Sequence, residues 1–247
     1  RQMCIRDRGT TGLNSSTEPR SAEIVMEIHA QLKVEWQQAD FHSPGSHLSL
    51  LYSDKRSALF PLNSVLFPGC ILTLQIFEQR YLRLIKACLR DNHGFVVILI
   101  SSGKEVGDAP ETYSIGTYVE IIDWETLDNG LFGITIKAQY RVRVTNPSVQ
   151  DDGLMTGEIE TLLSGETPDS ADALQIADLI DILKQLEQHP YIEQQPMKTD
   201  YTSTYDVCHK LSQLLPLDPL VKQSLLEIDS SAEKIDRLRD LINRLQQ

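Results

Sequence analysis

The chain of 247 residues has few of the features that mark membrane-spanning, secreted or nucleic-acid-binding proteins. It contains no run of 18 or more apolar residues, so the sequence predicts no transmembrane helix, and its first residues lack the apolar centre of a secretory signal. The formal net charge of −12 argues against a nucleic-acid-binding surface, which requires a basic stripe. Because 41% of the residues are hydrophobic and 23% are charged, we expect an ordinary globular protein.

Cysteine is scarce as well. The four cysteines are Cys4, Cys70, Cys88 and Cys208. They form no Cys-x-x-Cys pair, which removes the usual zinc and redox motifs. Cys70 and Cys88 fall on apolar faces, so we interpret them as buried thiols of a cytoplasmic protein. His42 and His47 lack a third ligand, and we therefore expect no metal site.

The common catalytic motifs are also missing from the sequence. A phosphate-binding loop of the form Gly-x-x-x-x-Gly-Lys-Ser/Thr is absent, because Gly103 and Lys104 are followed by Glu105. No Gly-x-Ser-x-Gly, His-Glu-x-x-His or Gly-x-Gly-x-x-Gly motif occurs. We therefore predict a protein that is not an enzyme and that uses no cofactor.

Residues 1–57 show no clear pattern of strands. Residues 1–20 are polar and rich in Arg, Ser, Thr and Gly, a composition typical of disorder. No initiator Met opens the sequence. We interpret residues 1–57 as a poorly ordered or non-native segment and leave them out of the predicted fold.

Residues 58–163 have the alternating apolar pattern of strands. A short strand over residues 59–62 contains a proline, which places it at a sheet edge or a bulge. Residues 67–69, Phe-Pro-Gly, are a turn. A strand over residues 70–76 then leads into an amphipathic helix over residues 78–90.

The remaining strands follow this helix, which ends at residues 92–94 with Gly94 expected in the left-handed conformation. Further strands are predicted over residues 95–100, 113–124, 131–138, 140–145 and 153–163. Asp-Asn-Gly at residues 128–130 predicts a tight hairpin, and Asn-Pro at residues 146–147 predicts another turn. Six or seven short strands and one helix favour a small barrel or a curled sheet.

The last third of the sequence has a helical pattern after a polar linker over residues 164–170. Helices are predicted over residues 171–188 and 202–215, and Asp218 caps a short third helix. A Ser-x-x-Glu capping box at residues 230–233 opens the final helix. Four helices joined by short loops predict a bundle.

Three short sequence segments in the strand region are typical of one protein family. They are Phe60-Pro61-Leu62-Asn63, Leu66-Phe67-Pro68-Gly69 and Ile76-Phe77-Glu78-Gln79-Arg80-Tyr81. Matching segments continue at residues 94–100, 114–117, 131–135, 214–217 and 222–227. In this order, over about residues 58 to 245, they resemble the N-terminal, substrate-binding domain of the ATP-dependent Lon protease family, with Gln79 where that family usually has proline.

The resemblance implies an α+β fold, in which a β-rich, PUA-like pseudobarrel with one helix is followed by a helical bundle. We expect the barrel over residues 58–163, the linker over residues 164–170 and the bundle over residues 171–247. The full-length family protein also has an ATPase and a serine–lysine peptidase. Because neither has a counterpart in the sequence, we expect a stand-alone domain protein, with a fragment of a complete protease as the alternative.

The resemblance also implies a non-enzymatic module that binds unfolded or tagged proteins and peptides, as an adaptor in proteolysis or quality control. A protease and a second copy of the chain are further expected partners, whereas nucleic acid and membranes are not. The alternative function is structural self-association through the last helix. A small hydrolase or a nucleic-acid binder is disfavoured by the missing motifs and the acidic charge.

Several apolar side chains near turns are candidates for contact with a peptide, because extended peptides bind sheet edges and apolar grooves. The candidates are Phe67, Pro68, Tyr81, Trp124, Leu131 and Phe132. Core packing is the alternative interpretation of each. Arg80 is expected to form an internal ion pair with Glu78 or a strand carboxylate, and the acidic charge favours basic or neutral peptides.

Overall fold

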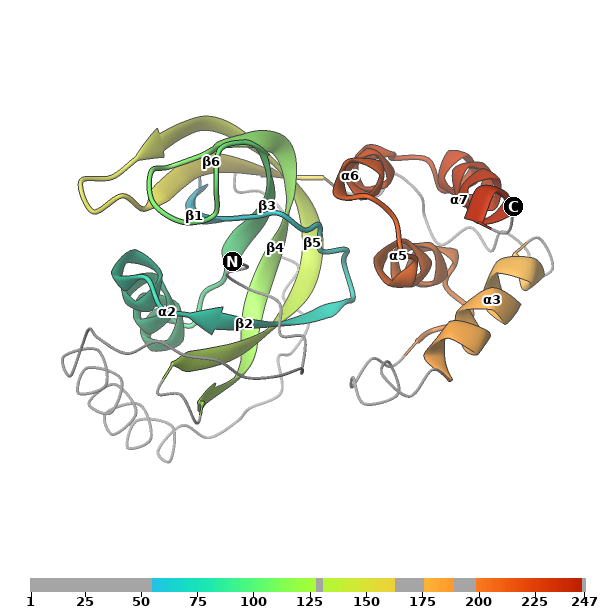
Figure 1. Ribbon diagram of the computed structural model, residues 1–247, viewed down its shortest axis with the longest axis horizontal. Coiled ribbons are helices and arrows are strands. Elements are labelled where there is room, and N and C mark those ends of the chain that lie inside the picture. The colour runs from blue at the N-terminus through green and yellow to red at the C-terminus, as the bar shows by residue number, and fades with distance from the viewer. Residues whose placement is uncertain (1–54, 128–130, 163–175, 189–198, 246–247) are drawn as a thin grey trace, which may run out of the picture.

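The computed structural model describes residues 55–127, 131–162, 176–188 and 199–245 (Figure 1). These residues form six strands: β1 (Lys55–Leu62), β2 (Ile71–Ile76), β3 (Phe95–Ser102), β4 (Glu111–Thr126), β5 (Phe132–Val149) and β6 (Met155–Thr161). They also form five helices: α2 (Gln79–Asp91), α3 (Ala177–Glu187), α5 (Thr204–Leu214), α6 (Pro219–Glu227) and α7 (Ser231–Leu245). The fold is therefore mixed α and β, with the strands before most of the helices. The predicted hairpin turn, the linker and nearly all of residues 1–57 lie outside the described residues.

The six strands form one sheet that closes on itself. Its order is β2-β5-β4-β3-β1-β6, and β5 pairs in addition with β6. Only β1 and β3 run parallel, and the other pairs are antiparallel. Five strands thus form a continuous ring, which leaves no free edge among them. Strand β2 is attached to the outside of this ring through β5 alone.

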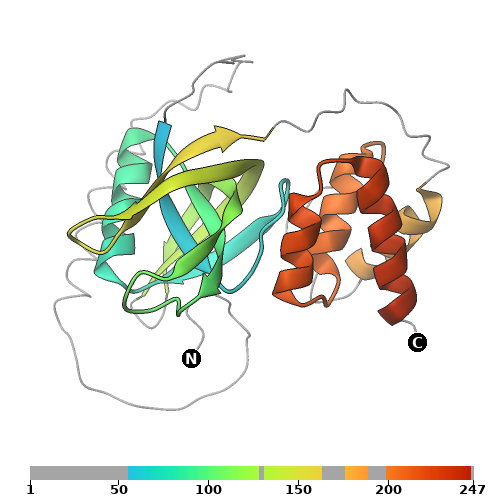
Figure 2. The same ribbon diagram turned by 90° about the horizontal axis from the view of Figure 1, so that it is seen from above.

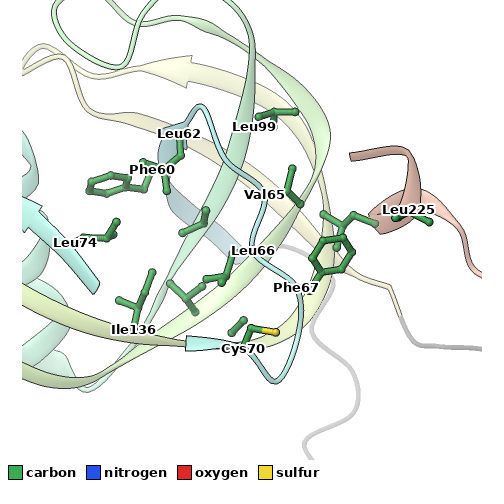
Figure 3. Close-up of a cluster of buried hydrophobic side chains, with 14 of the residues drawn as sticks. Phe60, Leu62, Val65, Leu66, Phe67, Cys70, Leu74, Leu99, Ile136 and Leu225 are labelled. Atoms are coloured by element: carbon green, nitrogen blue, oxygen red, sulfur yellow. The ribbon is translucent and has the colours of Figure 1, made fainter. Parts of the chain in front are cut away.

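The core of the ring is filled from β1, β3 and α2. Residues Phe95 to Ile100 are all buried, as the continuous apolar run of β3 predicts. Helix α2 turns an apolar face inward, and the ring of Tyr81 lies 4.2 Å from that of Phe60 between centroids. Figure 3 shows Phe60 with its buried neighbours inside the ring.

The end of α2 differs from the prediction. The residue in the left-handed conformation is Asn92, with φ of 49°, and not Gly94. Asparagine tolerates this conformation better than most residues, so the left-handed cap lies two residues before the predicted glycine, while the helix itself runs to Asp91, one residue past its predicted end. Gly94 has another role, because a Cβ at this position would lie 1.9 Å from the carbonyl oxygen of Val119.

The predicted turn at residues 146–147 is also wrong. These two residues lie inside β5, which continues to Val149. The pairing with β6 shifts register between Thr145 and Ser148, and Asn146 has φ of 49°. The Asn-Pro pair therefore forms a bulge that bends one long strand, so the predicted strands over residues 131–145 are parts of β5.

Helices α6 and α7 begin at the predicted caps, and α5 begins at Ser203, a cap that was not predicted. The Ser203 hydroxyl accepts a hydrogen bond from the Asp206 amide, and Asp218 accepts one from the Leu220 amide. Ser230 Oγ likewise accepts a bond from the Glu233 amide at 3.4 Å. Helix α5 packs against α3, α6 and α7. Figure 2 shows these helices on one side of the barrel, facing the loop between β1 and β2.

Candidate binding surface

Four of the six predicted contact residues are buried. They are Phe67, Pro68, Tyr81 and Phe132. Their side chains have almost no exposed area, so none can contact a peptide in this conformation. Each of these side chains packs between structural elements whose contact cannot be read from the sequence pattern. Core packing, the alternative interpretation, therefore describes all four. Trp124 and Leu131 are half-buried and keep some exposed surface.

Phe67 shows what such a buried residue does. It points from the loop between β1 and β2 toward α6, beside Leu225 (Figure 3). Its amide donates a hydrogen bond of 3.0 Å to Oε1 of Gln213 on α5. The carbonyl of the preceding Leu66 accepts a bond of 2.6 Å from the buried Thr117 hydroxyl. The family-matching segments around residues 60–69 therefore connect the barrel to the helices.

Arg141 makes a second link between the barrel and the helices. Its side chain extends from β5 and is 1% exposed. One guanidinium nitrogen, Nη1, donates to the carbonyl oxygens of Leu226 at 2.8 Å and Ile228 at 3.0 Å, and Nη2 pairs with Asp229 at 2.8 Å. These contacts hold the end of α6 against the barrel.

A buried histidine lies next to this junction. His209 on α5 is 0% exposed, and its Nε2 accepts a hydrogen bond of 3.0 Å from Nζ of the buried Lys234. Its ring lies 3.8 Å from that of Tyr205 and 5.7 Å from that of Phe67. Burial, together with the charges of Lys234 and Arg141, holds the pKa of His209 well below its usual value, so the imidazole is neutral.

The predicted ion pair of Arg80 is present. Arg80 Nη2 lies 2.9 Å from Oε2 of Glu78, and Nη1 donates to the carbonyl oxygen of Gly153 at 2.9 Å. Burial raises the pKa of Glu78, and the Arg80 charge opposes that rise. Both residues stand at the start of α2, and the bond from Arg80 to Gly153 connects the helix to the β5–β6 hairpin.

Some of the exposed apolar residues lie on or next to strands β2 and β4. Phe77 is 40% exposed and Ile122 is 46% exposed, whereas Leu127 and Leu131 are half-buried. Cross-strand pairing places Ile76 and Thr126 opposite Phe132, so Phe77, Leu127 and Leu131 lie at the same end of the sheet, whereas Ile122 lies further along β4, beside Thr135 and Ile136 of β5. We name Phe77, Ile122, Leu127 and Leu131 the hairpin surface.

Glycine keeps part of this surface flat. Gly133 lies opposite Gln75 on one side and Glu125 on the other. A Cβ at Gly133 would lie 3.3 Å from the side chains of both Glu125 and Leu127, which therefore fold over the glycine. These two side chains lie over Gly133, whose backbone is itself buried.

The charges beside the hairpin surface are mainly negative. Glu120, Asp123 and Glu125 are exposed on β4, and Lys137 on β5 is the exposed cation opposite them. The Glu120 carboxylate also accepts a hydrogen bond of 2.9 Å from the Gln139 amide. A ligand at this face meets a net negative field, which favours neutral or basic partners.

The sequence analysis missed Phe77 and Ile122 as contact candidates. The signal for Phe77 was present, because it follows β2 on the face opposite Leu74 and Ile76. Ile122 lies where the pairing of β4 with β5 shifts register, between Ile121 and Asp123. A register shift of this kind has no signature in the apolar alternation, so its exposure could not be predicted.

The described residues offer no metal chemistry. No group of three or more His, Cys, Asp or Glu side chains in residues 55–127, 131–162, 176–188 and 199–245 could hold a metal ion. In the same ranges, no helix is long and apolar enough to cross a membrane. The arrangement can therefore bind through apolar contact, backbone hydrogen bonds and charge.

Comparison with known proteins gives the family of this chain. The family model for the ATP-dependent protease La (LON) substrate-binding domain matches residues 57–244. The chain belongs to this family. Among solved structures, the Lon N-terminal domain protein from Xanthomonas campestris is 28% identical with a TM-score of 0.62, over 76% of this chain and 98% of that one. The N-terminal domain of Mycobacterium avium complex Lon protease, 15% identical with a TM-score of 0.56, covers 75% and 97% and supports the fold alone.

Curated relatives are Lon proteases. Lon protease 1 of Bdellovibrio bacteriovorus is 26% identical over 206 residues, which are 74% of this chain and 24% of the relative. Lon protease 1 of Bacillus subtilis is 21% identical over 201 residues, which are 76% and 25% of the two chains. The chain spans about a quarter of the length of these relatives. The matched region is the substrate-binding domain.

Proposed function

We propose that the chain is a recognition module that binds unfolded or tagged segments of other proteins through the hairpin surface. The observation that carries this proposal is the exposure of two large apolar side chains, Phe77 at the end of β2 and Ile122 on β4, in a member of a substrate-binding family. Large apolar side chains that stay exposed beside polar neighbours mark interaction sites. Membership of the family supplies the class of ligand, a protein substrate.

The proposal includes Trp124 and Leu131 from the sequence-based candidates. Trp124 stacks on Phe132 with centroids 5.5 Å apart and is half-buried against the core. Aromatic side chains of this kind supply much of the energy of protein interfaces. We expect neutral or basic segments to bind best, because Asp123 and Glu125 stand beside the surface.

The experiment is a binding titration with an unfolded, basic protein. Reduced and carboxamidomethylated ribonuclease A, labelled with fluorescein, is titrated with the wild type and with Phe77→Ser and Ile122→Ser variants. Each variant is expected to weaken binding by at least fivefold, because it removes an apolar contact from the surface. Val149→Ser is the control, since Val149 is 54% exposed at the far end of β5. Equal weakening by Val149→Ser, or none by the other two, contradicts the proposal.

A second function, self-association, is favoured by a different observation. Leu220 on α6 is 59% exposed and Leu245 at the end of α7 is 49% exposed. Exposed leucines on neighbouring helices suit a contact between two copies of the chain. Sedimentation equilibrium across a hundredfold range of concentration tests it: a constant monomer mass excludes self-association, and a dimer that Leu220→Ser dissociates supports it.

Finer assignments belong to the same proposal. We interpret the ring of strands as a PUA-like pseudobarrel and the four later helices as a bundle, joined by a linker near residues 164–170. The module acts without catalysis of its own, in the cytoplasm, as an adaptor that presents clients to a protease. The buried thiols of Cys70 and Cys88 suit a reducing compartment.

A further inference from the structure

Strand β2 is the one described strand that has a neighbour on a single side. Every other strand of the sheet pairs on both sides, because β5 and β6 close the ring. Residues 71–76 of β2 pair with residues 132–137 of β5 and with no other described strand. The outer edge of β2 therefore presents backbone groups that the sheet itself does not bond.

The alternation of antiparallel bonds identifies these groups. The Ala138 amide donates to the carbonyl oxygen of Cys70 at 2.9 Å, which starts the ladder between β2 and β5. From there, every second residue of β2 bonds β5, and the residues between them turn N–H and C=O outward. The outward residues are Ile71, Thr73 and Gln75. Thr73 lies at the centre of this edge, and its side chain is exposed on a face of the sheet.

The edge also lacks the devices with which proteins block edge pairing. Natural edge strands carry lysine, proline, inward-pointing charge or a bulge that disrupts further pairing. Residues 71–76 read Ile-Leu-Thr-Leu-Gln-Ile and contain no charge, proline or glycine. They are β-branched or apolar at most positions, which favours a further strand. A sequence so suited to pairing, left on an edge, fits a strand whose outer side has a partner.

We propose that the outer edge of β2 binds an extended segment of an unfolded polypeptide as an additional strand of the sheet. This inference rests on the proposed function and specifies how the client is held. The segment spans about six residues, roughly 20 Å, the length of β2. It carries apolar side chains at alternate positions, no proline, and neutral or basic residues between them.

Two features favour a client segment over a second copy of the chain. The formal net charge of −12 makes two copies repel each other. Asp123 and Glu125, exposed on β4 of the same sheet, add negative charge two strands away from β2. A strand added to β2 would also bring its side chains beside Phe77, so that backbone pairing and the hairpin surface act on the same client.

The test uses a backbone substitution that spares the fold. In Thr73→Pro the outward N–H is lost and the proline ring obstructs the edge, while the bonds of Leu72 and Leu74 to β5 remain. Thr73→Val is the control, because it keeps the N–H and the strand preference. The probe is a fluorescein-labelled ten-residue peptide of alternating valine and lysine. We expect Thr73→Pro to bind it at least tenfold more weakly than the wild type, and Thr73→Val to stay within twofold.

A measurement on the wild type keeps the inference testable if Thr73→Pro does not fold. Amide exchange followed by NMR should show fast exchange at Ile71, Thr73 and Gln75 in the free protein and at least tenfold slower exchange with saturating peptide. Slow exchange in the free monomer would overturn the inference, because the edge would already be covered by the chain itself. Protection that rises with protein concentration alone would overturn it in favour of a second copy.

The outcomes separate this inference from the proposed function. If Thr73→Pro binds the peptide and unfolded ribonuclease A as tightly as the wild type does, the edge is not the site, although the recognition function stands. If the wild type binds neither probe, the recognition function and the edge site both fail. Loss of binding in Thr73→Pro, with Phe77→Ser weakened independently, supports both.

Discussion

Arg141 and Asp229 form an ion pair of 2.8 Å that connects strand β5 to the loop after helix α6. The two partners differ in environment, since the Arg141 side chain is 1% exposed and that of Asp229 is 72% exposed. The exposed carboxylate is screened by water, so the pair itself contributes little. The larger contribution comes from the hydrogen bonds of Arg141 to the carbonyl oxygens of Leu226 and Ile228.

Replacing Arg141 should therefore cost much more than replacing its charged partner. Arg141→Met leaves two carbonyl groups without their donor, and we expect the free energy of unfolding to fall by about 3 kcal/mol. Asp229→Asn should change it by less than about 1 kcal/mol. Urea unfolding followed by circular dichroism measures both. Equal effects of the two substitutions would contradict this account of the junction.

His209 should make the stability depend on pH. Its folded pKa lies well below the usual value of about 6.5, because of burial and the nearby Lys234 and Arg141 charges. The folded state keeps His209 neutral, whereas the unfolded state binds a proton below pH 6.5. The contribution is thus complete above pH 6.5 and declines as the pH falls from there toward the folded pKa.

The measurement is the free energy of unfolding of the wild type and of His209→Phe at pH 7.5, 6.5 and 5.5. Below pH 6.5 the wild type should lose about 1 kcal/mol per pH unit more than the variant, close to the limit for one proton. The comparison of slopes cancels the carboxylates and other histidines common to both proteins. Parallel slopes would contradict this account, because they would show that His209 binds a proton equally in the folded and unfolded states.

Gly94 should tolerate no side chain. A Cβ there would lie 1.9 Å from the Val119 carbonyl oxygen and 2.9 Å from the Tyr118 ring, and both atoms belong to the paired strand β4. We expect Gly94→Ala to lower the free energy of unfolding by about 3 kcal/mol or more. Gly107→Ala is the matched control, because no atom lies within 4 Å and only its φ of +96° opposes the substitution. The control should cost about 1 kcal/mol. Thermal unfolding of both variants measures these changes in the free energy of unfolding.

The buried thiols should resist alkylation. Burial raises the pKa of Cys70 and of Cys88 to about 12, so almost no thiolate forms at pH 8. Native protein treated with iodoacetamide should keep both unmodified for a time that labels them completely in guanidinium chloride. Peptide mass spectrometry reads out each cysteine separately. Labelling of Cys70 in the native protein would show that the junction between the barrel and α5 opens.

Much of the fold could be predicted, because local signals decide it. Asp218 and Ser230, both predicted as caps, precede α6 and α7, and the apolar run of β3 marks a buried strand. The errors at Asn92 and at residues 146–147 have one cause. Asparagine adopts the left-handed conformation both at helix ends and in bulges, so its local signal does not distinguish a turn from a bend in a strand.

The binding residues were harder to predict, because exposure depends on partners far apart in the sequence. Phe67 and Phe77 are both aromatic residues beside a turn. Phe67 is buried by α5 and α6, which lie about 140 to 160 residues later in the chain, whereas no described element buries Phe77 to the same extent. The segments that match the family identified the fold because their residues form the core. Since the site candidates were chosen from the same segments, most of them are core residues.

The closed ring limits what backbone pairing can build. In the described part of the chain, β2 is the one strand of the sheet that has a partner on a single side, so a further strand can be added at its outer side. If two copies paired through β2, the outer edge of β2 would be covered in each copy, and assembly would stop at a dimer. An open sheet has two such sides and can propagate into a fibre. Closure of the barrel therefore allows the protein to keep a strand with an unpaired edge on its surface without promoting its own aggregation.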